Sequence, residues 1–86
     1  MKFATVIEYG NRDRIAEVRP VHREYLSGLK EQGKLFASGP FEDDSGALII
    51  YEAESLEEAE GLIAADPFSK AGVFQNYTIK PWRQVF

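Results

Sequence analysis

Residues 2–9, KFATVIEY, carry apolar side chains on both alternations of an extended chain. One face of such a strand presents four aromatic or β-branched side chains: Phe3, Thr5, Ile7 and Tyr9. The opposite face presents Ala4 and Val6. A strand that is apolar on both faces is normally covered on both faces. The segment therefore predicts a strand in a sheet that has a packed layer on each side.

The segment from about 12 to 32 has the period of an amphipathic helix. Its apolar stripe recurs at spacings of three and four: Ile15, Val18, His22, Tyr25, Leu26 and Leu29. Pro20 lies inside this segment, and a proline in a helix interior costs about 3 kcal/mol. We therefore expect a kink, or a break near Arg19 with Pro20 in the first turn of a new helix. Gly33 is placed to end the helix.

A second helix is predicted to follow a capping box at Ser55 and Glu58. Its buried stripe consists of Leu56, Ala59 and Ile63. The next position on that stripe is Asp66. The dipeptide of Asp66 and Pro67 is also a capping signal of its own, with Gly72 as the glycine that ends the short helix.

Three further strands are expected, at about 34–39, 47–53 and 73–82, and the turn EDDSG separates the first two. The element order is therefore β-α-β-β-α-β. This order predicts an α+β, ferredoxin-like fold with a four-stranded antiparallel sheet. Both helices must pack on one face of the sheet, because the crossovers are right-handed.

The opposite face of this sheet is still apolar, and no segment of the chain is left to cover it. With 86 residues, the chain is expected to form a single domain over residues 1–86. Hydrophobic residues make up 44% of the chain and aromatic residues 13%, which is a large apolar surface for so small a body. A second copy packed face to face would bury this surface, so a homodimer is expected.

The net charge of -4 argues against nucleic acid and against an anionic membrane surface as partners. The chain has no cysteine, which excludes disulfides and thiolate chemistry. Its longest purely apolar run, ALII, is far too short to span a bilayer, and the N-terminus lacks a signal-peptide pattern. We therefore expect a soluble, cytoplasmic protein.

His22 is the only histidine, and it lies within the apolar stripe of the first helix. The stripes of the two helices each aim one ionisable residue, His22 and Asp66, at the sheet. If the two meet, Asp66 would hold the imidazole in one tautomer, with one carboxylate oxygen capping a helix and the other facing the histidine. Such a pair in a cleft can act as a general base or acid near neutral pH. One histidine with scattered acids does not suggest a metal site.

The same residues also have purely structural explanations. A lone histidine on an apolar stripe is more often a core residue, and capping is a sufficient role for Asp66. Ser38, Gly39 and Pro40 end a strand, where a glycine lets a ligand approach the backbone, although a plain turn explains them equally well. No nucleophile elbow, dinucleotide fingerprint or phosphate-binding loop is present, so a serine hydrolase is not expected.

Four stretches in this order resemble the YciI-like (YCII-related) family: RPVHREYL, GKLFASGPF, AADPFSKAGVF and YTIKPWRQVF. The resemblance covers nearly the whole chain and implies a dimeric α+β barrel, with a cleft near the dimer interface built around a His–Asp pair. His22 and Asp66 match that pair. Arg19 matches the arginine before the histidine, and Ser38, Gly39 and Pro40 match the family's turn.

The resemblance also implies a reaction type. Some members of the family are dehydrochlorinases of chlorinated hydroxyquinols, and the fold is similar to that of muconolactone isomerase. This implies proton transfer on a small, aromatic or anionic metabolite by a lyase or isomerase without metal or organic cofactor. His22 would be the general base or acid, Asp66 would orient it, and Arg19 would attract an anion. The alternative is a non-catalytic small-molecule-binding or accessory dimer with a structural His–Asp hydrogen bond.

Overall fold

The computed structural model describes residues 1–86. Its elements, in chain order, are β1 (Lys2–Tyr9), a 3-10 helix (Arg12–Arg14), α1 (Ile15–Glu31), β2 (Leu35–Pro40), β3 (Gly46–Glu52), α2 (Leu56–Ala64), α3 (Pro67–Lys70) and β4 (Phe74–Trp82). Each predicted strand lies within one residue of its expected position, because alternating apolar side chains and turn residues mark strand ends clearly.

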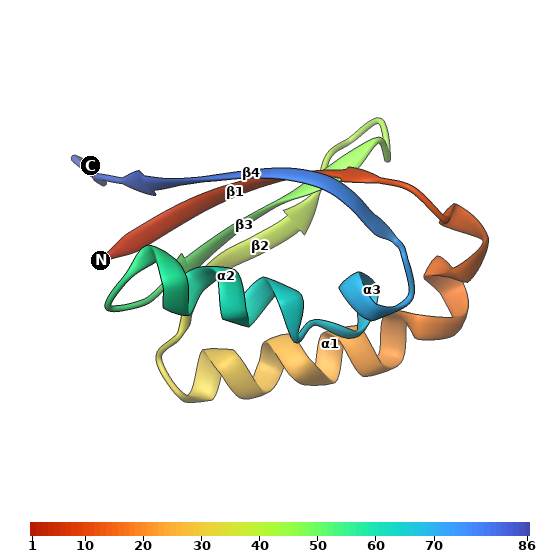
Figure 1. Cartoon of the computed structure of the whole chain (residues 1–86), viewed down its shortest axis with the longest axis horizontal. Helices are drawn as coiled ribbons and strands as arrows, with labels where there is room; N and C mark the ends of the chain where they lie inside the picture. Colours follow the sequence, from red (N-terminus) through yellow and green to blue (C-terminus); the bar gives the residue numbers. More distant parts are fainter.

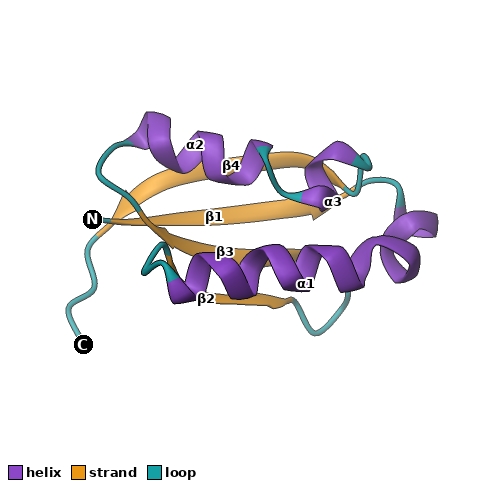
Figure 2. Cartoon of the chain, turned by 90° about the horizontal axis from the view of Figure 1, so that it is seen from below, coloured by secondary structure: helices purple, strands orange, loops and turns teal.

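The four strands form one antiparallel sheet in the order β2-β3-β1-β4. β1 is central, and its Thr5 lies opposite Ile49 of β3 and Ile79 of β4. Figure 1 shows α1, α2 and the short α3 on the same side of this sheet, and Figure 2 shows them from that side. The predicted α+β, ferredoxin-like fold with its helices on one face is confirmed.

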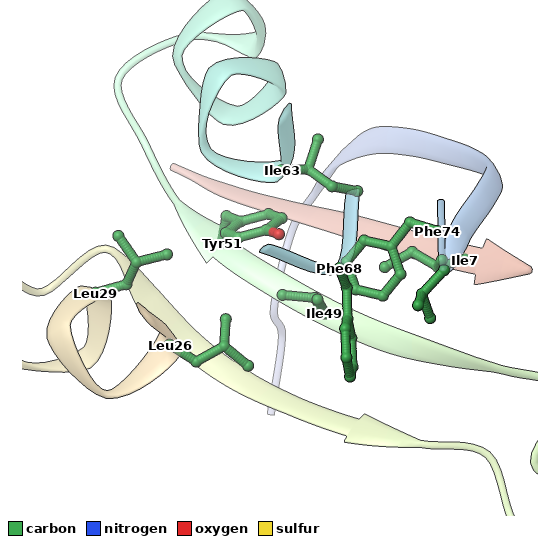
Figure 3. Packing of buried hydrophobic residues seen from close by; sticks show 9 residues of the cluster. Ile7, Leu26, Leu29, Ile49, Tyr51, Ile63, Phe68 and Phe74 are labelled. Carbon is green, nitrogen blue, oxygen red and sulfur yellow. The ribbon is translucent and has the colours of Figure 1, made fainter. Parts of the chain in front are cut away.

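The core lies between the sheet and the helices. Figure 3 shows it built from β1, β3 and β4 on one side and from the three helices on the other; its buried members are Ile7, Leu26, Leu29, Ile49, Tyr51, Ile63, Phe68, Val73 and Phe74. Full burial of a side chain of this size contributes about 1.5–3 kcal/mol. The expected stripe of α1 is confirmed, since Leu26 and Leu29 are buried and Ile15, Val18 and Tyr25 pack against the same cluster.

α1 runs as one helix through Pro20, so the predicted break near Arg19 is wrong. Pro20 and Ala16, whose carbonyl lacks its usual helical donor, are both exposed to solvent. Water can therefore take the place of the missing hydrogen bond. The burial of Leu26 and Leu29 further along the same helix offsets the cost of the proline.

Both α1 and α3 end in the same glycine motif. Gly72 has φ +77°, and the Val73 amide donates to the carbonyl of Phe68 at 2.9 Å. Both Phe68 and Val73 are buried, so this end of α3 is fixed in the core. The motif holds Phe68 in place beside the candidate site described below.

The sheet face opposite the helices is not covered within the chain. Val6 of β1 lies directly opposite Leu48 of β3 on this face, and the two are 48% and 37% exposed. A second copy as the cover of this face stays a prediction. No helix has both the length and the apolar character that a membrane crossing demands.

Candidate active site

His22, from the middle of α1, and Asp66, from the loop between α2 and α3, form a hydrogen bond of 2.8 Å between Nδ1 and Oδ1. The side chain of Asp66 is completely buried and that of His22 is 12% exposed. A carboxylate only accepts, so His22 Nδ1–H is the donor. In neutral His22 the lone pair therefore lies on Nε2, which has no hydrogen-bond partner within the chain.

Asp66 is also the N-cap of α3. Its backbone is extended, Pro67 follows at the first helical position, and the Phe68 amide donates to Asp66 Oδ1 at 2.8 Å. The same oxygen thus accepts from both His22 and Phe68, and the prediction of one oxygen for each role is wrong. The two donors converge because α3 packs against α1. Asp66 Oδ2 is buried and has no partner in the chain.

Aromatic side chains confine the imidazole ring. The Phe68 ring stacks on His22 with centroids 3.9 Å apart and 14° between the planes. The Phe74 ring meets His22 edge-on at 5.8 Å and 88°. These two contacts, together with the Asp66 hydrogen bond, fix the direction of Nε2.

Two tyrosines near Asp66 remain protonated at neutral pH. Burial, and then the negative charge of Asp66, raise the pKa of Tyr25, whose hydroxyl donates to the Leu62 carbonyl at 2.6 Å. The same two causes, in the same order, raise the pKa of Tyr51. The Tyr51 hydroxyl, which is buried without a partner, is therefore neutral.

Two cavities adjoin at His22, Arg23 and Pro40, which line both of them. The larger, of about 670 Å³, lies between α1 and β2. Ser38, Gly39 and Pro40 line it, and Ser38 lies opposite Ile49, whose side chain is in the core on the helix side of the sheet. The structure therefore places the predicted turn residues on the same groove as His22.

The smaller cavity, of about 350 Å³, is rich in cationic groups. Arg19 lines it as expected, together with Arg12 and Arg23, which the sequence reasoning missed. Arg19 and Arg23 are four residues apart on α1, a spacing that places them on one helix face and could have revealed them. No guanidinium of the three forms an ion pair within the chain.

Tyr9 and Asp44 complete the charged end of this smaller cavity. Burial raises the pKa of Tyr9, while the positive charges of Arg19 and Arg12 act to lower it and the charge of Asp44 acts to raise it. Tyr9 therefore lies within the field of all three groups. The chain has no group of three or more histidine and acidic side chains that could hold a metal ion.

Comparison with known proteins gives relatives of similar length. The chain is 38% identical over 79 residues to protein YciI of Escherichia coli O6:H1, covering 80% of this chain and 81% of that one. It is 40% identical over 62 residues to the uncharacterized protein YjpA of Bacillus subtilis, covering 72% of each.

Two solved structures are also similar. One is 5-chloro-2-hydroxyhydroquinone dehydrochlorinase from Burkholderia phenoliruptrix in complex with 2,5-dihydroxybenzoquinone, with a TM-score of 0.83, 29% identity, and coverage of 96% of this chain and 94% of that one. The other, an antibiotic biosynthesis monooxygenase, has a TM-score of 0.64, 17% identity and 99% coverage of both chains, which supports the fold alone. The model of the YCII-related domain matches residues 1–83, and the chain belongs to this family.

Proposed function

We propose that the chain is an enzyme of the lyase or isomerase type that moves a proton on a small, aromatic or anionic metabolite without a metal or organic cofactor. The observation that carries this proposal is the hydrogen bond of 2.8 Å from His22 Nδ1 to Asp66 Oδ1. With Nδ1 engaged, Nε2 is the free ring nitrogen of a side chain that lines both cavities. His22 is the general base or acid, and Asp66 is its positioning residue.

The proton transfer follows from this arrangement. His22 Nε2 accepts a proton from a C–H or O–H group of the substrate and becomes an imidazolium. The carboxylate of Asp66 stabilises that cation at hydrogen-bond distance. The proton then returns to another atom of the substrate in an isomerase, or leaves to solvent after a group departs in a lyase. General-base catalysis of this kind contributes roughly 10²–10⁴-fold.

The structurally similar dehydrochlorinase supports the reaction type. Its name describes the loss of hydrogen chloride from 5-chloro-2-hydroxyhydroquinone, and such a loss requires a base that takes the proton. At 29% identity and a TM-score of 0.83 the two chains share a fold. We extend only the reaction type, proton removal coupled to departure of a group, to the present chain.

Ser38 and the backbone of Gly39 would bind a polar group of the substrate, and Pro40 would shape the groove between them and His22. Arg19 would attract an anion.

The protein would act in the cytoplasm as a homodimer joined through the open sheet faces, without nucleic acid or membrane partners. The exposed pair of Val6 and Leu48 supports the dimer, because an apolar sheet face is normally covered.

The alternative is a non-catalytic binding or accessory protein, in which His22 and Asp66 form a structural hydrogen bond. The close stacking of His22 on Phe68 and its small exposed fraction favour this role. The two functions differ in whether turnover depends on Nε2.

Chloride release from 5-chloro-2-hydroxyhydroquinone, measured with the whole protein, tests the proposal. We expect His22→Ala to lower the rate at least a hundredfold. Ser55→Ala, which removes the other helix cap and lies outside both cavities, serves as the control and should keep the wild-type rate. Equal rates in wild type and His22→Ala, both above the uncatalysed rate, would reject catalysis by His22. Binding of 2,5-dihydroxybenzoquinone without any turnover would favour the non-catalytic alternative.

A further inference from the structure

The two cavities that meet at His22 differ in chemistry. The larger groove is uncharged along β2, with Ala37, Ser38 and Gly39 in sequence, whereas its α1 wall carries Arg23, Lys30 and Glu31 beside Leu26. The smaller cavity has three arginines and one carboxylate, that of Asp44. His22, with its free Nε2, lies on the boundary between them.

The arginines give the smaller cavity a formal charge of +2 (three arginines minus Asp44) in a chain whose net charge is -4. Of the five arginines in the chain, only Arg14 forms an ion pair, with Glu17 at 2.7 Å. Arg12, Arg19 and Arg23 have no such partner. An anion bound in the cavity would supply it, and guanidiniums bind carboxylates and similar planar anions in pairs of hydrogen bonds.

We propose that the smaller cavity is an anion subsite and that the substrate is a small planar anion. Its negatively charged group binds Arg12, Arg19 and Arg23, while its uncharged part extends into the groove along β2. The atom that gains or loses a proton then lies at the boundary, next to His22 Nε2. This inference rests on the proposed function for its catalytic part, but not for the binding of the anion.

Asp44 limits the strength of this subsite. It lies in the turn between β2 and β3 with φ 58°, held by a hydrogen bond of 2.9 Å from its amide to the Phe41 carbonyl. Its carboxylate lines the same cavity as the arginines and repels a bound anion. Removal of this charge should therefore strengthen anion binding, an effect opposite to that of removing an arginine.

Calorimetric titration with 2,5-dihydroxybenzoquinone, which is acidic and ionised at neutral pH, tests the subsite, and uncharged hydroquinone is the matched probe. We expect Arg12→Gln and Arg23→Gln each to weaken binding of the anion about tenfold. Asp44→Asn should tighten it several-fold. Arg14→Gln, which removes the same charge outside the cavity, is the control and should bind like wild type. Hydroquinone should bind equally weakly to all variants.

The proposal is overturned if wild type shows no measurable binding of the anion, or if Arg12→Gln and Arg23→Gln bind it as tightly as Arg14→Gln. Far-ultraviolet circular dichroism of each variant checks that it is folded. If the arginine variants bind weakly but His22→Ala turns over like wild type, the subsite stands and the proposed acid–base role fails. If His22→Ala is inactive while the arginine variants bind normally, the role of His22 stands and the subsite fails.

Discussion

The ring of His22 stacks on the ring of Phe68 with 3.9 Å between centroids and 14° between planes. Phe68 follows Asp66 by two residues, so one short segment supplies both the hydrogen-bond partner and the flat surface for the imidazole. The α3 segment therefore determines both the hydrogen bond and the orientation of the His22 ring. Any change in this segment should alter the position of the ring.

Replacement of Phe68 by leucine should separate the stacking from the core packing. We expect a loss of about 1–2 kcal/mol in the free energy of unfolding, because most of the buried volume is kept. The NMR shift of the His22 Cε1 proton should change, since the ring current of Phe68 is lost. Phe86→Leu, at a fully exposed position outside both cavities, is the control. An unchanged His22 shift would argue against the stacked geometry.

Asp66 allows charge and hydrogen bonding to be separated. Both donors use Oδ1, so Asp66→Asn can keep them and lose only the charge, whereas Asp66→Ala loses both bonds. We expect Asp66→Ala to lower the free energy of unfolding by about 2–4 kcal/mol, because the helix cap and the hydrogen-bond partner of His22 are lost together. Ser55→Ala, which loses only a cap, should cost about 1 kcal/mol. Urea denaturation measures all three, and equal costs for the two alanine variants would contradict the shared role.

The raised pKa of Tyr51 predicts that the folded protein loses stability at high pH. Burial and the charge of Asp66 raise its pKa in the folded protein, whereas the unfolded chain ionises near 10.0. Below that pH both states hold the proton. Above it only the unfolded state releases the proton, so stability falls as the pH rises, by up to about 1.4 kcal/mol per pH unit. The stability of Tyr51→Phe should fall less steeply with rising pH. This variant should lose little stability at neutral pH, because the Tyr51 hydroxyl has no hydrogen-bond partner. Thermal unfolding from pH 8 to 11 measures the slopes; equal slopes would refute the prediction.

The two glycines at the ends of the β2–β3 hairpin should respond in opposite ways to alanine. A Cβ at Gly46 would clash with the backbone carbonyl of Ile7 in the central strand, so Gly46→Ala should cost about 3 kcal/mol or more. A Cβ at Gly39 would meet no atom within 4 Å, so Gly39→Ala should fold at least as stably as wild type. Its methyl group would nevertheless narrow the groove and weaken binding of 2,5-dihydroxybenzoquinone. Melting temperatures and calorimetry check both parts, and normal binding by Gly39→Ala would exclude Gly39 from the site.

The fold was predictable because its signals are local. The alternation in residues 2–9, the capping box at Ser55 and the glycine at Gly33 each depend on a few neighbours in the chain. The contact of His22 with Asp66 was also predictable. Helical spacing placed His22 on the buried face of its helix, and the Asp-Pro signal placed Asp66 at the start of a helix. The role of these two residues in chemistry stays a proposal.

The rest of the site depends on contacts between distant segments. Arg12 from the 3-10 helix, Arg23 from α1 and Asp44 from the hairpin turn line one cavity only because the sheet brings that turn beside α1. The stacking of Phe68 and the shared Asp66 oxygen likewise arise from the docking of α3 against α1. Even the error at Pro20 has this origin, since tertiary packing outweighed a local preference.

The oxygen that His22 and Phe68 share makes the Phe68 amide an internal spectroscopic probe. When His22 gains a proton at Nε2, its Nδ1–H draws more electron density from Asp66 Oδ1, and the amide hydrogen bond of 2.8 Å to the same oxygen weakens. The amide proton should therefore shift upfield as the histidine is protonated or as a ligand donates to Nε2. One backbone signal in a two-dimensional NMR spectrum then follows the state of the site, before any substrate has been identified.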